Sequence, residues 1–175
     1  MKCISILQPR GSLVVTKDPK TGKAYKQIET RSWDTKYRGP LLIHASKGKQ
    51  FLKLPTNGPL WLHYPQRLIE TMPYGAIIGM VNVVDTFKMG AVWGMIQQNM
   101  KIILGGRVVD FSKQEIAFGD YSSHDRYGWL LSDPILFKDP IPCKGNLSIW
   151  NLPKELEDSV INVFGLGEVA EPELK

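Results

Sequence analysis

Apolar and polar positions in the first part of the chain predict short strands separated by turns. Residues 2–7 have the character of a first strand, and Gln8-Pro9 then introduces a brief helix, because proline is tolerated in a first helical turn. Residues 16–27 hold four lysines without apolar periodicity, which predicts an exposed turn or hairpin tip. The apolar run at 41–46 predicts a largely buried strand that ends at Lys47.

The later part of the chain alternates strands with short helices. A helical stretch broken at Pro55 and Pro59 is expected to reach about Met72, and residues 76–87 predict a central strand because they are rich in β-branched side chains. Gly79 within that strand indicates a bulge or a bend at a barrel corner. The remaining expectations are an ambiguous segment at 91–104 that allows a helix up to Met100, paired strands at 126–131 and 134–138, a closing strand at 144–150, and a final helix from Pro153 to about Val163.

These elements favour one α+β unit, mainly β, built as a small mixed β-barrel flanked by short helices. No repeat or linker divides the 175 residues, so we expect residues 1–153 to form the domain and residues 154–175 to add a C-terminal helix and an acidic tail to the same unit. Hydrophobic residues make up 43% of the chain, which is enough for a core and excludes wholesale disorder.

Targeting and redox signals indicate a cytoplasmic protein with no membrane partner. No run approaches the roughly 20 consecutive apolar residues that a membrane span needs, and the N-terminus lacks the apolar core and cleavage site of a signal peptide. Cys3 and Cys143 lie far apart in sequence, so we interpret both as buried thiols rather than as part of a disulfide framework or a zinc cluster.

Charge is distributed unevenly behind a net value of +5. Residues 10–53 hold eleven Lys or Arg against three acids, a local net of +8, whereas residues 155–175 hold six acids against Lys175, a net of −5. The asymmetry predicts an anionic partner for the N-terminal third, with a merely solvated lysine-rich loop as the alternative.

Most common catalytic patterns are absent from the sequence. The histidines at 44, 63 and 124 have no carboxylate or cysteine at metal-ligand spacing, so neither a metal nor a cofactor is expected. There is no GxSxG nucleophile elbow, and Gly105-Gly106 lacks the remaining glycines and the lysine of a phosphate-binding loop.

The segment from Lys26 to Trp33 carries the clearest candidate chemistry. An extended chain there places Glu29, Arg31 and Trp33 on one face, which we expect to point outward. A lysine held beside a carboxylate and partly desolvated is usable as a base or nucleophile, and an arginine can grip phosphate with its planar fork. The alternatives are a surface strand of alternating charges, a salt bridge between Glu29 and Arg31, and a Trp33 that packs in the core instead of stacking on a base.

Several sequence blocks, in their order, resemble the ASCH domain family. Residues 24–31 (AYKQIETR) are similar to its GxKxxExR motif, with alanine in place of the glycine and a lengthened preceding loop. The other similar blocks are residues 3–9 (CISILQP), 37–47 (YRGPLLIHASK), 118–121 (FGDY), 127–131 (YGWLL) and 145–150 (GNLSIW).

The resemblance implies a fold like the PUA barrel, with a cleft between barrel and helix into which the motif residues point. It also implies RNA, a nucleotide or a nucleoside as ligand. Some ASCH proteins are ribonucleases or deacylases of N-acetylated cytidine, and others are linked to transcription coactivators. The small nucleoside-hydrolysing members use a threonine three residues after the motif lysine, where this chain has Glu29, and a glutamate further downstream, to which we assign no residue of this chain.

The leading hypothesis is therefore an RNA- or nucleotide-binding domain with a basic cleft built from Lys26, Glu29, Arg31 and Lys47. The alternatives are a metal-independent hydrolase, either an N-acetylcytidine-type amidohydrolase or a ribonuclease, with Lys26 as catalytic base or nucleophile assisted by Glu29, and an interaction domain of a transcription coregulator. The candidate ligand-binding residues are Lys26, Glu29, Arg31, Trp33, His44, Ser46, Lys47, Asp120 and Tyr121.

Overall fold

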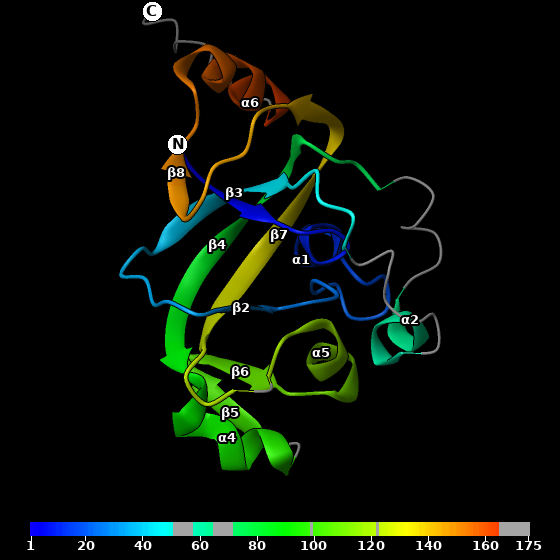
Figure 1. Cartoon of the computed structure of the whole chain (residues 1–175), viewed down its shortest axis with the longest axis vertical. Coiled ribbons are helices and arrows are strands. Elements are labelled where there is room, and N and C mark those ends of the chain that lie inside the picture. The colour runs from blue at the N-terminus through cyan, green and yellow to red at the C-terminus, as the bar shows by residue number, and fades with distance from the viewer. Residues whose placement is uncertain (51–57, 65–71, 99, 122, 165–175) are drawn as a thin grey trace, which may run out of the picture.

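Six strands form one curled sheet in the computed structural model, which describes residues 1–50, 58–64, 72–98, 100–121 and 123–164 (Figure 1). The sheet order is β2-β7-β4-β3-β1-β8, with β1 parallel to β3 and the other neighbours antiparallel. The strands are β1 (Lys2–Ile6), β2 (Ile28–Arg31), β3 (Gly39–Ala45), β4 (Ala76–Lys88), β7 (Tyr127–Pro142) and β8 (Ile149–Asn151). The curl makes a half-barrel, so the predicted α+β, mainly β class is confirmed.

Short helices and one hairpin flank the half-barrel. They are α1 (Arg10–Val15), α2 (Pro59–His63), α4 (Met89–Gln97), β5 (Lys101–Leu104), β6 (Arg107–Asp110), α5 (Lys113–Phe118), the 3-10 helix η2 (Lys154–Leu156) and α6 (Glu157–Val163). In Figure 1, α6 lies at the same end as β8, and the β5–β6 hairpin lies with α4 at the opposite end. None of the helices described is long and apolar enough to cross a membrane.

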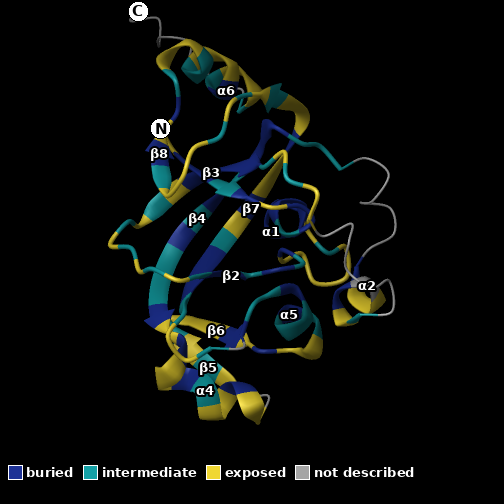
Figure 2. Ribbon diagram, viewed as in Figure 1, coloured by how far each residue is buried: buried dark blue, intermediate teal, exposed yellow. Residues whose placement is uncertain are grey.

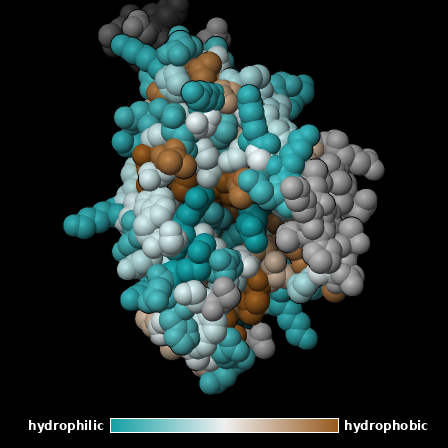
Figure 3. Space-filling view, in the orientation of Figure 1, coloured by the Kyte–Doolittle hydropathy of each residue, from teal (hydrophilic) through white to brown (hydrophobic). Residues whose placement is uncertain are grey.

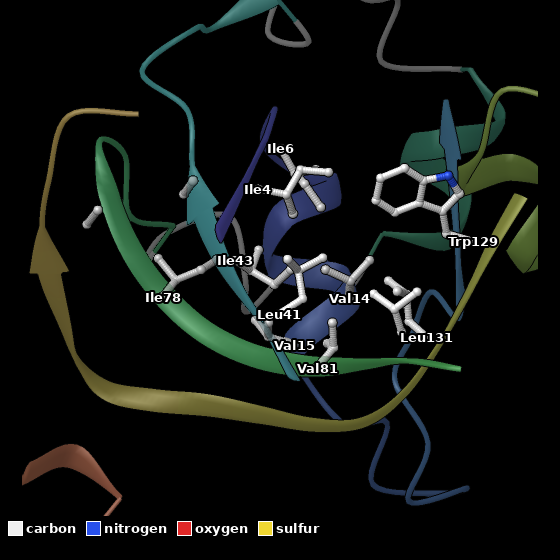
Figure 4. Packing of buried hydrophobic residues seen from close by; sticks show 13 residues of the cluster. Ile4, Ile6, Val14, Val15, Leu41, Ile43, Ile78, Val81, Trp129 and Leu131 are labelled. Carbon is white, nitrogen blue, oxygen red and sulfur yellow. The ribbon is translucent and has the colours of Figure 1, made fainter. Parts of the chain in front are cut away.

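The main core lies inside the curve of the sheet. Val14 and Val15 of α1 pack there against side chains of β1, β3, β4 and β7, including the fully buried Trp129 (Figure 4). Burial is therefore greatest in the sheet and α1, while α2, α4 and α6 keep exposed faces (Figure 2). Because α1 fills the concave face, the chain that leaves it is held close to the open side of the half-barrel.

Gly79 confirms the bend predicted within the central strand. The register between β4 and β7 shifts between Ile77 and Gly79, and a Cβ at Gly79 would lie 2.2 Å from the Ile135 carbonyl oxygen and 2.9 Å from Val15 Cβ. Glycine is thus required where β7 and α1 approach the backbone of β4 most closely. This close approach seats α1 in the sheet.

One expectation for the second half was wrong. Residues 126–131 and 134–138 do not pair with each other, because they are successive parts of β7, which stays continuous through a residue of positive φ, Asp133 (φ 49°), and pairs with β4 by shifting register. The ambiguous segment at 91–104 divides into the end of α4 and strand β5. Gly105 and Gly106, with φ of 53° and 72°, make the two-residue turn into β6, which the sequence did not predict as a hairpin.

Most other expectations are confirmed, but the closing strand predicted at 144–150 begins only at Ile149 and runs to Asn151. The first strand, the brief helix after Pro9, the buried strand before Lys47 and the final helix after Pro153 are all present within a few residues of their predicted bounds. α2 matches part of the predicted helical stretch, whose other residues, 51–57 and 65–71, lie outside the described residues. The acidic tail at 165–175 also lies outside them.

Candidate functional site

A hairpin after α1 carries Lys26 into the half-barrel. Lys17 and Ala24 form an antiparallel β-bridge that closes this hairpin. The positive φ of 70° that the turn needs is provided by Gly22, so the motif's glycine position can be occupied by Ala24 without backbone strain. The Lys26 amide then donates to the Leu13 carbonyl at 3.2 Å. The predicted exposed hairpin tip is present, but the chain between this tip and β2 is buried at Lys26, whose side chain is 0% exposed.

Lys26 lies between two carboxylates. Its Nζ is 3.6 Å from Glu115 Oε1 and 3.9 Å from Glu29 Oε2, and Glu29 Oε1 lies 3.0 Å from Arg31 Nε. We call this group, together with Tyr121, the Lys26 cluster. Its two cations and two carboxylates balance, which is what allows four charges to be held in a mostly buried site.

Glu115 is the member of the cluster that the sequence interpretation missed. It lies on α5, and its carboxylate accepts hydrogen bonds from the amides of Gln27 (2.7 Å) and Ile28 (3.2 Å) and from the Tyr121 hydroxyl (3.0 Å). Glu115 also stands three residues after Ser112, whose hydroxyl oxygen accepts from the Glu115 amide. The S-x-x-E pattern indicated a helix start, but nothing in it indicated that the carboxylate would reach β2.

Burial determines the acid–base character of the cluster. Desolvation lowers the pKa of Lys26 below its ordinary value, against the opposing effect of Glu115 and Glu29, and the Arg10 charge lowers it further. Burial and the neighbouring Glu115 carboxylate raise the pKa of Tyr121 well above its ordinary value. Among the described residues, neither Lys26 Nζ nor Glu29 Oε2 has a hydrogen-bond partner. Both atoms are buried and form an ion pair with each other at 3.9 Å, a distance too long for a hydrogen bond.

Arg31 joins the two open edges of the half-barrel. Its NH2 group donates to the Ser5 carbonyl of β1 at 2.9 Å, while its side chain remains 24% exposed. The Ser5 carbonyl is accessible because the pairing of β8 with β1 covers only Lys2 to Ile4. Arg31 thus links the β2 edge to β1 and reaches the surface beside the buried Lys26.

The face that carries Glu29, Arg31 and Trp33 was expected to point outward, and this is wrong. Glu29 pairs with Trp129 in the register of β2 and β7, and the Trp33 ring packs edge-on against Trp129 with 4.7 Å between ring centroids. The charges can point inward because they neutralise one another. Trp33 is a partly buried side chain packed against the core.

The loop before β7 borders the Lys26 cluster, as Asp120 and Tyr121 were expected to do. Tyr121 is buried against Glu115, whereas the Asp120 carboxylate is 43% exposed and lies 3.3 Å from the Arg126 guanidinium. The Asp120 amide also donates to the Thr30 hydroxyl at 3.1 Å. These contacts fix the loop against β2.

His44, Ser46 and Lys47 lie in a different place. With Ser5, Gly75 and the segment 142–147 they line a pocket of about 730 Å³ at the ends of β1, β3 and β7, which we call the His44 pocket. His44 Nε2 lies 3.1 Å from the Cys143 carbonyl and Nδ1 lies 3.2 Å from the Ser5 hydroxyl. Because a carbonyl only accepts, Nε2 carries the proton. Burial lowers the pKa of His44, and the Lys47 charge adds to that effect.

The structure therefore separates the predicted site residues into two groups. Lys26, Glu29 and Arg31 come together with Tyr121 and border Asp120, whereas Lys47 belongs to the His44 pocket and has no ion pair with the Lys26 cluster. Hydrophilic side chains gather in a hollow near the middle of the face shown in Figure 3, between hydrophobic ones. No group of three or more His, Cys, Asp or Glu suited to a metal ion occurs in the described part of the chain.

Comparisons with known proteins agree with this architecture. The model of the ASCH domain matches residues 5–140. Among solved structures, the ASCH protein of Zymomonas mobilis is similar at 13% identity and a TM-score of 0.51, over 92% of this chain and 93% of that chain. A point mutant of that protein gives 13% identity and a TM-score of 0.50, over 92% and 96%. No curated protein matches. Because the ASCH model matches well over half of the residues of this chain, the chain belongs to the ASCH domain family.

Proposed function

We propose that this chain binds RNA or a nucleotide-like ligand through the Lys26 cluster and the basic surface around it. The observation that carries the proposal is the pair of buried atoms Lys26 Nζ and Glu29 Oε2, which lack hydrogen-bond partners among the described residues. The ion pairs that Nζ makes with Glu29 and Glu115, at 3.9 Å and 3.6 Å, are longer than hydrogen bonds, so a bound polar group would complete the hydrogen bonding of both atoms. A donor and an acceptor side by side suit the polar edge of a base.

The surface beside the cluster supports an anionic ligand. Arg31 reaches solvent next to Lys26, and its guanidinium retains donors beyond the one given to Ser5. The exposed lysines of the hairpin and of the loop after β2 are Lys17, Lys20, Lys23 and Lys36, whereas the exposed Arg38 is ion-paired with Asp85 at 2.9 Å. Phosphates neutralised by such side chains release counterions, so binding weakens as salt increases.

The test is a gel-shift titration of single-stranded and structured RNA at two salt concentrations. We expect salt-dependent binding by the wild type, and a loss of at least about tenfold in Lys26→Met, which keeps the length of the side chain but removes its charge. Lys101→Met, which alters an exposed lysine of β5, is the matched control. The proposal would be contradicted if the wild type did not bind RNA at low salt. It would also be contradicted if the wild type, Lys26→Met and Lys101→Met bound RNA equally, provided that thermal melting shows all three to be folded.

A second function is favoured by the lowered pKa of Lys26. A lysine that is neutral more often than usual can act as a general base in a metal-independent hydrolase. In N-acetylcytidine, the amine would take a proton from a water molecule whose oxygen attacks the acetyl carbonyl. The C–N bond then breaks, acetate leaves, and the proton passes to the exocyclic nitrogen of cytidine. Glu29, 3.9 Å from Nζ, is placed to orient the lysine or the water.

Product formation in EDTA distinguishes the two functions. We expect a hydrolase to release acetate from N-acetylcytidine, or fragments from an RNA panel, and to lose turnover in Lys26→Met but not in Lys101→Met. An RNA-binding module would give the salt-dependent gel shifts with no turnover on any substrate. Turnover that persists in Lys26→Met would exclude Lys26 as the base.

A further inference from the structure

The His44 pocket has an electrostatic character unlike that of the Lys26 cluster. It opens where β1 and β3 end and β4 begins, and segment 142–147 forms its rim. Its lining residues are Ser5, His44, Ser46, Lys47, Gly75, Pro142, Cys143, Lys144, Gly145, Asn146 and Leu147, and none of them is acidic. With a neutral His44, the lining carries two positive charges and no negative charge to balance them.

Both cations of the pocket are available for a ligand. Within the described residues, neither Lys47 nor Lys144 forms an ion pair, and both side chains are exposed. The aliphatic part of the Lys47 side chain nevertheless packs against the Gly75 backbone, because a Cβ at Gly75 would lie only 2.6 Å from Lys47 Cε. Gly75 also has a φ of 64°, so a side chain is disfavoured there on two grounds. The stem of Lys47 thus passes over Gly75 at the pocket wall.

The rim is fixed by polar side chains from the sheet. His44 holds the Cys143 carbonyl, and the Ser5 hydroxyl donates to the Asn146 carbonyl at 2.9 Å. Gly145 lies so close to the His44 ring that its Cβ would be 2.4 Å from Cε1. The rim therefore takes a definite position, and the side chain of Leu147 extends from it, 93% exposed. Pro142 adds a second apolar side chain to the lining.

We propose that the His44 pocket is a second binding site, which takes a nucleotide with its phosphate between Lys47 and Lys144. Lysine binds phosphate as a point charge, and Ser46 at the same wall supplies a hydroxyl. Leu147 and Pro142 provide an apolar surface for the base or the ribose, and about 730 Å³ is in the usual range for small-molecule sites, well beyond the needs of inorganic phosphate. The free nucleotide and the terminal nucleotide of an RNA share this chemistry.

The second site uses other cations than the proposed site at Lys26, namely Lys47 and Lys144. The two regions share Ser5, whose carbonyl accepts from Arg31 while its hydroxyl lines the pocket. Lys26 does not line the pocket, so its substitution removes no charge from the pocket walls. A nucleotide bound in this pocket would be lost on substitution of Lys47 or Lys144, and would be retained in Lys26→Met protein whose thermal melting shows that it is folded.

The experiment is isothermal titration of the full chain with AMP and UMP, the matching nucleosides, inorganic phosphate, and a short oligouridylate with and without a 5′-phosphate. We expect the monophosphates to bind more tightly than nucleosides and inorganic phosphate by about tenfold or more, with affinity falling at higher salt. Lys47→Ser and Lys144→Ser should each weaken monophosphate binding about tenfold, and Lys101→Ser should leave it unchanged.

The other arms decide the source of the phosphate and the fate of the proposal. A preference of the pocket for the 5′-phosphorylated oligonucleotide over free UMP would assign it to an RNA end, and the reverse to a free nucleotide. The proposal is overturned if no monophosphate binds, if inorganic phosphate binds equally well, or if both pocket variants bind like the wild type. Binding that is lost in Lys26→Met and retained in the pocket variants would also overturn it, while leaving the proposed function standing.

Discussion

The Lys26 cluster and the His44 pocket use charge in opposite ways within one half-barrel. In the cluster, two cations and two carboxylates are packed together, and Lys26 has no exposed surface. In the pocket, two lysines line an open space with no acid among its walls. In the first region the charges are offset by ion pairs inside the fold, with Arg31 as the partly exposed member, whereas the second region has two lysines without an ion pair among the described residues.

The difference shows which part of the N-terminal positive charge is available for binding. Lys26 belongs to the basic segment at 10–53, but its charge is largely offset by Glu29 and Glu115 inside the fold. The exposed lysines of that segment lie outside the cluster. Net charge along the sequence therefore overstates the field at the motif and understates it at the pocket, because Glu115 and Lys144 come from other parts of the chain.

The largest expected effect comes from removing the carboxylate on which the cluster depends. Glu115→Ala leaves Lys26 beside a single carboxylate and deprives two β2-side amides and the Tyr121 hydroxyl of their acceptor. Breaking a buried ion pair by removing one partner costs about 3–5 kcal/mol. Urea unfolding should show a loss of that size in the free energy of unfolding.

Asp139→Ala is the control for that loss, because Asp139 is exposed on β7 and should change stability by less than about 0.5 kcal/mol. A Glu115→Ala protein as stable as Asp139→Ala would mean that the cluster is not held by its charges, and the contrast between the two regions would fail.

The rim of the His44 pocket gives the next largest effect. A Cβ at Gly145 would meet the His44 ring at 2.4 Å and Ser5 Oγ at 2.7 Å, so Gly145→Ala should lower the free energy of unfolding by about 1–3 kcal/mol. Gly94→Ala, on α4 with no atom within 4 Å, should instead raise it by about 0.5–1 kcal/mol. Chemical denaturation of both variants checks the two signs, and a neutral Gly145→Ala would show that the rim is free to move.

Much of the fold could be predicted from local pattern. Strand β4 was evident from its β-branched residues, and Gly79 indicated its bend, because both signals depend on nearby residues. The continuity of β7 could not be predicted from Asp133-Pro134, since these residues usually end a strand. In the structure, β7 continues through these residues because Asp133 adopts a positive φ and the pairing of β7 with β4 shifts in register.

The candidate site was only half predictable for a different reason. The GxKxxExR-like segment placed Lys26, Glu29 and Arg31 together because they are neighbours in sequence. Glu115 is 89 residues from Lys26, and the Ser5 carbonyl that receives Arg31 is a backbone atom, so neither partner has a local signal. The inward orientation of the face depends on these partners, which explains why an outward one was expected.

Substitution of Arg31, which contacts Glu29 in the Lys26 cluster and Ser5 at the His44 pocket, should have a smaller effect on the free energy of unfolding. Lysine in its place keeps the charge beside Glu29 but lacks the planar fork that also reaches the Ser5 carbonyl. We expect Arg31→Lys to lower the free energy of unfolding by about 1–1.5 kcal/mol. Arg107→Lys, at an exposed ion pair with Asp133, should cost about 0.5 kcal/mol or less in the same unfolding measurement. Equal losses would show that bridging the open edges adds no stability.

The smallest expected effect is a dependence on pH at the His44 pocket. Burial lowers the pKa of His44 below its ordinary value of 6.5, so as pH falls below that value the unfolded chain takes up a proton that the folded chain resists. The His44 contribution to stability is therefore complete above about pH 7.5 and declines in acid, by at most about 0.8 kcal/mol between pH 8 and pH 6. Urea unfolding at both pH values should show this decline in the wild type and in His124→Gln, which alters an exposed histidine, but not in His44→Gln. If the decline persisted in His44→Gln, the pH dependence would come from other titratable groups. The role of His44 would then be limited to its hydrogen bond with the Cys143 carbonyl in the rim of the pocket.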